Sequence, residues 1–435
     1  MQLFREVGLL SSTFLVVGNI IGIGIFTTSG LIAAETGSSP WLVGVWVLGG
    51  FLALIGAICY SLLSVQRPLA GGEYAFLYPS YGPFAAFLSG WASLLIGFSA
   101  PIAASALGLA AYMSPFFPSE ISEHPLAQKG IAELILLCIS IFLTVGLKFG
   151  NRLHSVITMF NLALTIGFAT LVLRRAPVMQ NLEPIIGGRS SSLDLPALGS
   201  AIVMVMFAYS GWNAAAYIAE EIRRPQRYIP GALLLGTGTV IVVYLLMNLA
   251  YFGAVPLAQL QGEIAVAEVT ALATFGTEGM IIVNVLILFS ILSSITAMSI
   301  AGPRVYFAMS RDHLFPKWLA EVDQKKKIPL KSIWFQSLIA LILVGVGTFR
   351  QILIYSGFIL LLFSTLTVSV LFMTRNGKDD HPYFWILYRF LPALFVLINT
   401  VVLVNAAVSN PKETLAGIIT LALGIPVYFY YRGRA

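Results

Sequence analysis

Long apolar stretches separated by short polar segments dominate the chain. Twelve of them reach about 18 residues or more, enough to cross roughly 30 Å of hydrocarbon. Stretches of this length predict membrane-spanning helices, since barrel strands need only about 10 residues of alternating polarity. We therefore expect an all-α integral membrane protein. The predicted spans are 9–34, 41–66, 84–113, 129–147, 152–173, 196–220, 230–252, 279–309, 330–348, 350–374, 383–406 and 413–431.

Two of these spans are interrupted near their middle. The first contains GNIIGIGIF, Gly18 to Phe26, and the sixth contains FAYSGWN, Phe207 to Asn213. They open two successive sets of five spans, and interrupted helices at matching positions of two halves are typical of inverted-repeat transporters. Gly18 and Gly22 also form a GxxxG pattern, whose simpler interpretation is close helix packing.

The interruptions predict a five-plus-five inverted repeat of the LeuT type, with discontinuous first and sixth helices. Residues 1–175 would form the first repeat, residues 196–375 the second, and residues 383–435 two additional helices, all in one membrane domain. Unwinding a helix inside a bilayer exposes NH and C=O groups that cost several kcal/mol each when unpaired. A break must therefore face a polar ligand or water. The free amides beyond it suit a carboxylate and the free carbonyls before it suit an ammonium.

Composition and charge agree with a membrane protein. Hydrophobic residues make up 58% of the chain, charged residues only 10%, and mean hydropathy is +0.89. With the N-terminus in the cytoplasm, 19 of the 25 lysines and arginines fall on the inner side, which predicts that both termini are cytoplasmic. The net charge of +6 thus reflects topology. Since the basic residues are spread over loops, no nucleic-acid partner is expected.

Several classes of function lack their required residues. The two cysteines and four histidines show no ligand spacing, so we expect no metal site and no cofactor. No glycine-rich phosphate loop follows a strand, and the spans contain no His, Asp and Glu constellation for an enzyme. Residues 1–26 could be mistaken for a signal peptide, but no small-residue cleavage site precedes Ile20. We interpret them as part of an uncleaved first helix.

Four motifs together carry a family resemblance. They are GNIIGIGIF, FAYSGWN with the later Glu220 and Glu221, RPLAGGEYAFL (Arg67 to Leu77) and GPRVYFAMSRDHLFP (Gly302 to Pro316). In these motifs the chain resembles the amino acid, polyamine and organocation superfamily of transporters, most of all the L-type amino acid transporter light chains and their bacterial homologues. The resemblance covers essentially all twelve spans and implies alternating-access transport of an amino acid.

The resemblance also implies a substrate site. The carboxylate would meet backbone amides in the first break, and the ammonium would meet carbonyls from both breaks. Phe207 would close over the pocket as an aromatic gate, although a packed core aromatic remains the alternative. Trp212 and Asn213 would hold the unwound backbone and not the substrate. The substrate-binding residues so implied are Ile20, Ile21, Gly22, Ile23, Gly24, Phe207 and Ser210.

Three positions bear on ion coupling. Ile23 stands where many relatives have serine or threonine, so only backbone donors remain there. Asn161 aligns where many sodium-independent relatives carry a lysine that links the first and eighth spans, which puts a lysine-based proton mechanism in doubt. Ser293 and Ser294 could complete a sodium site with first-span carbonyls, or simply ease helix contact.

The sixth span ends in a cluster of charges. Glu220 and Glu221 precede Arg223, Arg224 and Arg227. We expect either a solvated loop or an inner gate whose ion pairs form and break during transport.

The expected substrate is a neutral L-amino acid, because no acidic or basic residue is expected in the binding region. Sodium-independent exchange or facilitated diffusion is favoured. A sodium- or proton-coupled symporter, a channel and a non-transporting sensor remain alternatives. The segment 114–128 has no cysteine, whereas the resemblance implies one there in animal light chains, so no disulfide-linked heavy chain is expected. We expect a monomer or homodimer in the plasma (inner) membrane, surrounded by lipid.

Overall fold

The computed structural model describes residues 3–37, 39–113, 117–118, 124–145, 147–176, 195–263, 265–346, 349–373, 385–409 and 411–433. Over these residues the chain is helical, and its only extended pairings are two isolated bridges, Val7 with Ile222 and Asp323 with Ile328. The expectation of an all-α protein is confirmed for this part of the chain. Most of the segment 114–128, on which the heavy-chain prediction rests, lies outside it.

Nine helices in the described ranges are long and apolar enough to cross a membrane. Three further predicted spans correspond to the shorter apolar helices Ala197–Ala208, Leu330–Gly345 and Ser356–Phe372. The elements are α1 Leu9–Ile20, α2 Gly24–Thr36, α3 Ser39–Gln66, α4 Glu73–Ala92, η1 Ser93–Ser99, α5 Ala100–Met113, α7 Pro125–Leu143, α8 Leu147–Arg175, α10 Leu195–Ala208, α11 Ala214–Tyr217, η3 Ala219–Glu221, α12 Pro225–Ala254, α13 Leu257–Leu260, α14 Val266–Ala301, α15 Pro303–Arg311, η4 Lys317–Ala320, α16 Leu330–Val346, α17 Phe349–Ser369, η5 Val370–Phe372, η6 Ile386–Phe390, α18 Leu391–Ser409 and α19 Pro411–Arg432.

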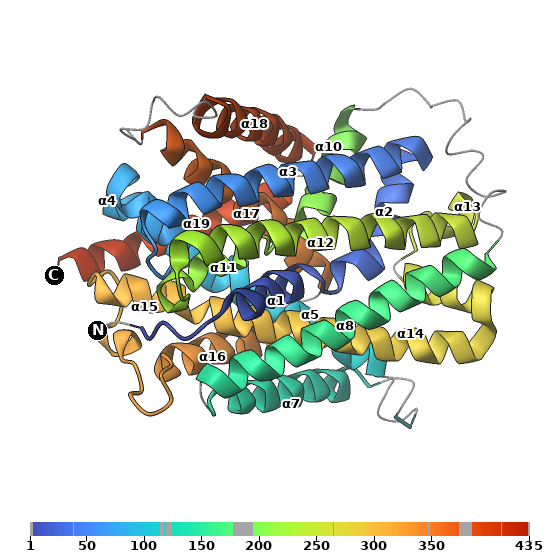
Figure 1. Cartoon of the computed structure of the whole chain (residues 1–435), viewed down its shortest axis with the longest axis horizontal. Coiled ribbons are helices and arrows are strands. Elements are labelled where there is room, and N and C mark those ends of the chain that lie inside the picture. Colours follow the sequence, from blue (N-terminus) through green and yellow to red (C-terminus); the bar gives the residue numbers. More distant parts are fainter. Residues whose placement is uncertain are drawn as a thin grey trace.

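The short helix α1 packs against α12, α8 and α14, and the short helix α10 packs against α2, α18 and α3 (Figure 1). Helix α12 packs against α3 and α1, and α14 packs against α8 and α5. Both chain ends and α15 lie at the same end of the bundle, which we call the terminal end. The outer helices carry large exposed apolar side chains such as Leu134, Val401 and Leu423, as expected for surfaces that face lipid.

Both predicted helix breaks are present. Helix α1 ends at Ile20 and α2 begins at Gly24. In the sixth span α10 ends at Ala208 and α11 begins at Ala214. Gly211 in the second break has φ of +100°, a conformation that is costly for any residue with a side chain beyond Cα. The sequence motifs thus located the two breaks to within a few residues.

Two spans begin well before their predicted starts. The third span starts with α4 at Glu73 and bends at Gly82, where φ is +81°. The eighth starts with α14 at Val266 and bends at Gly276, where φ is +72°. In both cases a helical segment continues the span beyond a glycine, so the apolar pattern alone placed the boundary too late. The described part of the segment 256–276 contains α13 and the first part of α14.

Gly211 offers a test of the second break. A Cβ at this position would lie 2.9 Å from the backbone C and O of Asn19. We expect Gly211→Ala to destabilise the protein by at least about 1–2 kcal/mol, from the positive φ alone. Gly238→Ala is the matched control, because its Cβ would meet nothing within 4 Å and alanine favours helix. Thermal unfolding in detergent would measure both, and equal melting temperatures would contradict the placement of this break.

Candidate substrate site between the two broken helices

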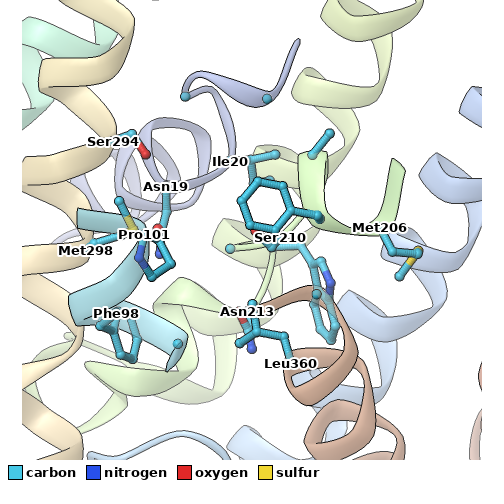
Figure 2. Close-up of a pocket in the computed structure, with 18 of the residues that line it drawn as sticks. Asn19, Ile20, Phe98, Pro101, Met206, Ser210, Asn213, Ser294, Met298 and Leu360 are labelled. Carbon is cyan, nitrogen blue, oxygen red and sulfur yellow. The ribbon is translucent and has the colours of Figure 1, made fainter. Parts of the chain in front are cut away.

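A cavity of about 100 Å³ lies between the two breaks. It is lined by the end of α1, the start of α2, the unwound segment after α10, and parts of η1, α5, α14 and α17 (Figure 2). Ser210 and Asn213 come from the unwound segment, while Ser294 and Met298 belong to α14 and Leu360 to α17. The segments whose polar backbone must be satisfied are therefore the ones that surround the cavity.

Most of the predicted substrate residues reach this cavity. Six of the seven line it, and Ile21 is fully buried without being among the lining residues. Phe207, the predicted aromatic gate, is half-buried in the cavity wall. The six are Ile20, Gly22, Ile23, Gly24, Phe207 and Ser210.

The carbonyl ends of both broken helices meet one phenol. Tyr244 of α12 places its hydroxyl 2.7 Å from the Ile20 carbonyl oxygen and 3.1 Å from that of Ala208. The Tyr244 ring is completely buried. The Ile20 oxygen also accepts a hydrogen bond from the Gly22 amide at 2.9 Å. An ammonium that reached this oxygen would therefore have to displace the hydroxyl, and this competition was not evident from the sequence.

The amide end of the first break is open to a ligand. Helix α2 begins without a side-chain cap. The Phe26 amide donates to the Ile23 carbonyl at 3.1 Å, while the earlier amides of the first turn have no intrahelical partner. The hydroxyls of Thr27 and Thr28 donate back to the carbonyls of Ile23 and Gly24. These threonines therefore leave the amides to another acceptor. A carboxylate suits such a helix N-terminus.

Glycines allow the two breaks to approach each other. A Cβ on Gly24 would lie 3.0 Å from the Ala208 Cα, tighter than most real Cβ contacts. A Cβ on Gly22 would lie 2.8 Å from the Ser294 hydroxyl. The glycines of the first motif thus serve both interpretations, since they pack closely and also line the cavity.

The sequence analysis missed an acidic residue in the cavity wall. Glu73, buried at the start of α4, lines the cavity. Its Oε1 accepts hydrogen bonds from the Tyr60 hydroxyl at 2.9 Å and from the Asn213 side-chain amide at 2.6 Å. The expectation of a binding region without a carboxylate is therefore wrong. The signal was present in GGEY of the second motif, but only the fold shows that this loop reaches the sixth span.

The bond to Glu73 explains the role of Asn213. Asn213 immediately precedes α11, and its side chain ties the unwound segment to the first turn of α4. This placement agrees with the prediction that Asn213 holds backbone. Trp212 lines the cavity and packs edge-on against Tyr60, with ring centroids 4.7 Å apart.

A π-helical segment and apolar side chains complete the wall. The π-helix η1 brings Gly97 and Phe98 to the cavity, and such segments are common at functional sites. Phe98 packs edge-on against Tyr217 at a centroid distance of 5.0 Å. Met298 and Leu360 add apolar surface (Figure 2). The sequence pattern gave no signal for this wall, which is built from residues distant in the chain.

The residues considered for ion coupling have separate partners. Asn161 accepts hydrogen bonds from Ser290 of α14 and Thr165 of α8. Ser293 exchanges a 2.7 Å hydrogen bond with Thr158 of α8, while Ser294 lines the cavity. The two serines thus face different surroundings, and a sodium site formed by both remains a prediction.

Glu220 and Glu221 form ion pairs, but not with the arginines that follow them. Glu221 holds Arg304 of α15 through Nε to Oε1 at 2.6 Å and Nη2 to Oε2 at 3.1 Å. Both side chains are almost fully buried. Glu220 pairs with Arg311 of α15 at 2.9 Å. The expected cluster with Arg223, Arg224 and Arg227 is therefore wrong, because those three side chains are exposed while α15 lies against η3.

Comparison with known proteins supplies the family. A family model described as amino acid permease matches residues 7–426. The chain belongs to this amino acid permease family. The permease is 28% identical over 438 residues to the mouse b(0,+)-type amino acid transporter 1, covering 99% of this chain and 88% of the relative. The resemblance to the superfamily of L-type light chains and their bacterial homologues is confirmed.

Two more relatives span the same length. The human large neutral amino acids transporter small subunit 2 is 28% identical over 437 residues, covering 98% of the permease and 80% of the relative. The serine/threonine exchanger SteT of Bacillus subtilis (strain 168) is 28% identical over 438 residues, which cover 99% of the permease and 97% of the relative. These relatives are amino acid transporters and not enzymes. The family, the helical fold and the cavity together support amino acid transport across a membrane by this permease.

Tyr244 offers a test of the site. We expect Tyr244→Phe to leave the carbonyls of both half-helices short of a donor, which costs about 1–3 kcal/mol. Tyr251→Phe is the matched control, because Tyr251 lies two turns further along α12, is buried, and has no partner for its hydroxyl within the described structure. Thermal unfolding in detergent should show a loss of stability for Tyr244→Phe only. Equal behaviour of the two variants would refute the shared-donor role.

Proposed function

We propose that this protein moves neutral L-amino acids across the plasma membrane by alternating access, as a sodium-independent exchanger or facilitated-diffusion carrier. The observation that carries the proposal is the meeting of two helix breaks around one cavity. The amides at the start of α2 suit a carboxylate, and carbonyls near the end of α10 suit an ammonium. The Phe207 oxygen, for example, accepts one backbone hydrogen bond, from Ser210 at 2.9 Å. A zwitterion satisfies both kinds of group together.

The alternation itself needs two halves that can move. We propose that the first and second sets of five spans form inverted repeats, followed by the two helices α18 and α19. Each break lies in the first span of its set, which supports this division. Twelve spans and cytoplasmic termini belong to the same proposal. The terminal end of the bundle would then face the cytoplasm.

Neutral substrates are favoured by how Glu73 is used. Its Oε1 accepts hydrogen bonds from Tyr60 and Asn213 and so holds the unwound segment, while its Oε2 is buried without a partner within the described structure. Within the described residues that line the cavity, no lysine or arginine is present. The printed names of two relatives, which refer to large neutral amino acids and to serine and threonine, point the same way.

We propose that the protein acts without a disulfide-linked heavy chain, as a monomer or homodimer. The absence of a cysteine between residues 114 and 128 supports this proposal. A non-transporting sensor would need the same site, and it differs only in failing to move its ligand.

Uptake into proteoliposomes tests the function directly. Purified protein would be reconstituted and supplied with labelled alanine, serine, leucine, arginine or glutamate, with and without the same amino acid inside. We expect the neutral amino acids to enter, to exchange with internal substrate, and to do so equally in sodium and in potassium buffers. Binding without any uptake would indicate a sensor, and uptake that requires sodium would indicate a symporter.

The ion pairs at the terminal end predict an effect on rate. Glu220→Gln removes the ion pair with Arg311. The Glu220 side chain is 10% exposed and the Arg311 side chain is 25% exposed. Losing about 1 kcal/mol from a latch that must open would speed opening about fivefold. We therefore expect faster exchange with little change in the KM for substrate. Glu321→Gln is the control, because that carboxylate pairs with Lys331 where both side chains are 49% exposed. A loss of affinity equal to the change in rate would argue against a gate.

A further inference from the structure

The side chain of Asn19 faces the cavity without a partner. Asn19 lies in the last turn of α1 and is 8% exposed. It lines the cavity, and in the described structure its amide oxygen and nitrogen border the open space there and form no hydrogen bond. A buried amide that is left unpaired costs free energy, so such a group calls for an explanation. The two helix breaks alone do not explain it.

Packing fixes where the Asn19 side chain lies. A Cβ on Gly211 would lie 3.0 Å from the Asn19 Cγ, so this side chain packs directly against the second break. Helix α1 also packs against α14, and a Cβ on Gly22 would lie 2.8 Å from the Ser294 hydroxyl of α14. Asn19 is therefore held between the second break and α14.

Ser294 adds a second free group on the same side of the cavity. It is 5% exposed and lines the cavity, and its hydroxyl forms no hydrogen bond in the part of the chain that the structure describes. Ser29 and Asn248, which do not line the cavity, are instead bonded to each other at 2.8 Å. Figure 2 shows Asn19 and Ser294 on one side and Met206 on the other. One wall thus offers an amide and a hydroxyl with unused capacity to form hydrogen bonds.

The main-chain groups of a bound amino acid do not need these side chains. In the proposed function the carboxylate meets the amides at the start of α2, and the ammonium meets carbonyls such as that of Phe207. Asn19 and Ser294 are then left for the substrate's own side chain. A hydroxyl or carboxamide there can pair with an amide, which both donates and accepts. An apolar side chain of the same shape removes water from Asn19 and returns no hydrogen bond.

We propose that Asn19, together with Ser294, contacts the substrate's side chain and selects neutral amino acids that carry a hydroxyl or carboxamide over apolar ones of the same shape. This inference rests on the proposed function, because it takes the carboxylate and the ammonium to be held by the two breaks. Those backbone contacts are the same for every amino acid. Selectivity among neutral substrates therefore has to come from side chains in the cavity wall.

The first experiment measures binding and requires no transport. The melting temperature of the purified protein in detergent would be followed against the concentration of threonine, valine, asparagine or leucine, which gives an apparent Kd for each. Threonine and valine share one shape, and asparagine and leucine share another. We expect the polar member of each pair to bind at least about fivefold more tightly, because the apolar member leaves the Asn19 amide unpaired.

Two substitutions locate the source of this preference. Asn19→Leu keeps the approximate shape of the side chain and removes its hydrogen-bonding groups, so the Kd ratio of valine to threonine should fall to about one. Asn399→Leu is the matched control. Asn399 of α18 is also fully buried, and its amide has no partner within the described structure, but it does not line the cavity. We expect this control to keep the wild-type ratio.

The second experiment measures exchange in proteoliposomes with the same four amino acids. The ratio of kcat/KM between threonine and valine should follow the ratio of binding constants in the wild type and in both variants. For Asn19→Leu we expect a higher KM for threonine with little change in kcat. Should Asn19→Leu lose its folded state, thermal unfolding would show it, and Asn19→Ala, which removes the amide and adds no bulk, then serves as the second variant with the same expected fall in the ratio.

The outcomes separate the two proposals. Equal binding of threonine and valine by the wild type, or an unchanged ratio in Asn19→Leu, overturns the role of Asn19 and leaves the transport function standing. An equal loss of affinity for both amino acids overturns it too, because Asn19 would then hold the main-chain groups. If the wild type binds these amino acids and exchanges none, the transport function fails, while the binding ratios still decide the role of Asn19.

Discussion

The structure depends on how unwound backbone is satisfied where no water is guaranteed. Two helices stop in the middle of the bundle, and each leaves carbonyls on one side of the break and amides on the other. Tyr244 reaches the carbonyl ends of both half-helices with one hydroxyl, and backbone turns satisfy part of the rest. What remains unpaired lines the cavity. The cavity is thus lined by backbone at both breaks, and a dipolar solute could pair with groups of both signs there.

The terminal end of the bundle adds a second constraint. The sixth span continues past its break into η3, where Glu221 forms an ion pair with Arg304 and both side chains are almost fully buried. Removing one partner of such a pair leaves a buried charge, whereas the more exposed pair of Glu220 and Arg311 can separate at lower cost. Arg304, near the start of α15, therefore holds the sixth span firmly through Glu221. The ion pair of Arg311, at the end of α15, with Glu220 separates more easily.

Local sequence predicted the helices and the breaks, because both follow from short-range patterns. Apolar runs set the spans, and Gly24 and Gly211 marked where backbone approaches backbone. The remaining features join residues hundreds of positions apart. Nothing near Tyr244 in the chain indicates which carbonyls its hydroxyl meets, and the partners of Glu220 and Glu221 lie on α15 and not among the adjacent arginines. The acid of GGEY was visible as a motif, but its position beside Asn213 required the fold. Glycine bends at Gly82 and Gly276 likewise extended two spans beyond their apolar limits.

The short extended bridge between Val7 and Ile222 has a practical meaning. The Val7 amide donates to the Glu221 carbonyl at 3.0 Å, and the Arg223 amide donates to the Val7 carbonyl at 2.9 Å. These two hydrogen bonds hold the segment before α1 against the end of the sixth span. Because α1 and the sixth span both line the cavity, these two hydrogen bonds give the two segments a second contact at the terminal end of the bundle. Labels or purification tags attached ahead of α1 would strain these two hydrogen bonds. Tags attached after α19 would not strain them.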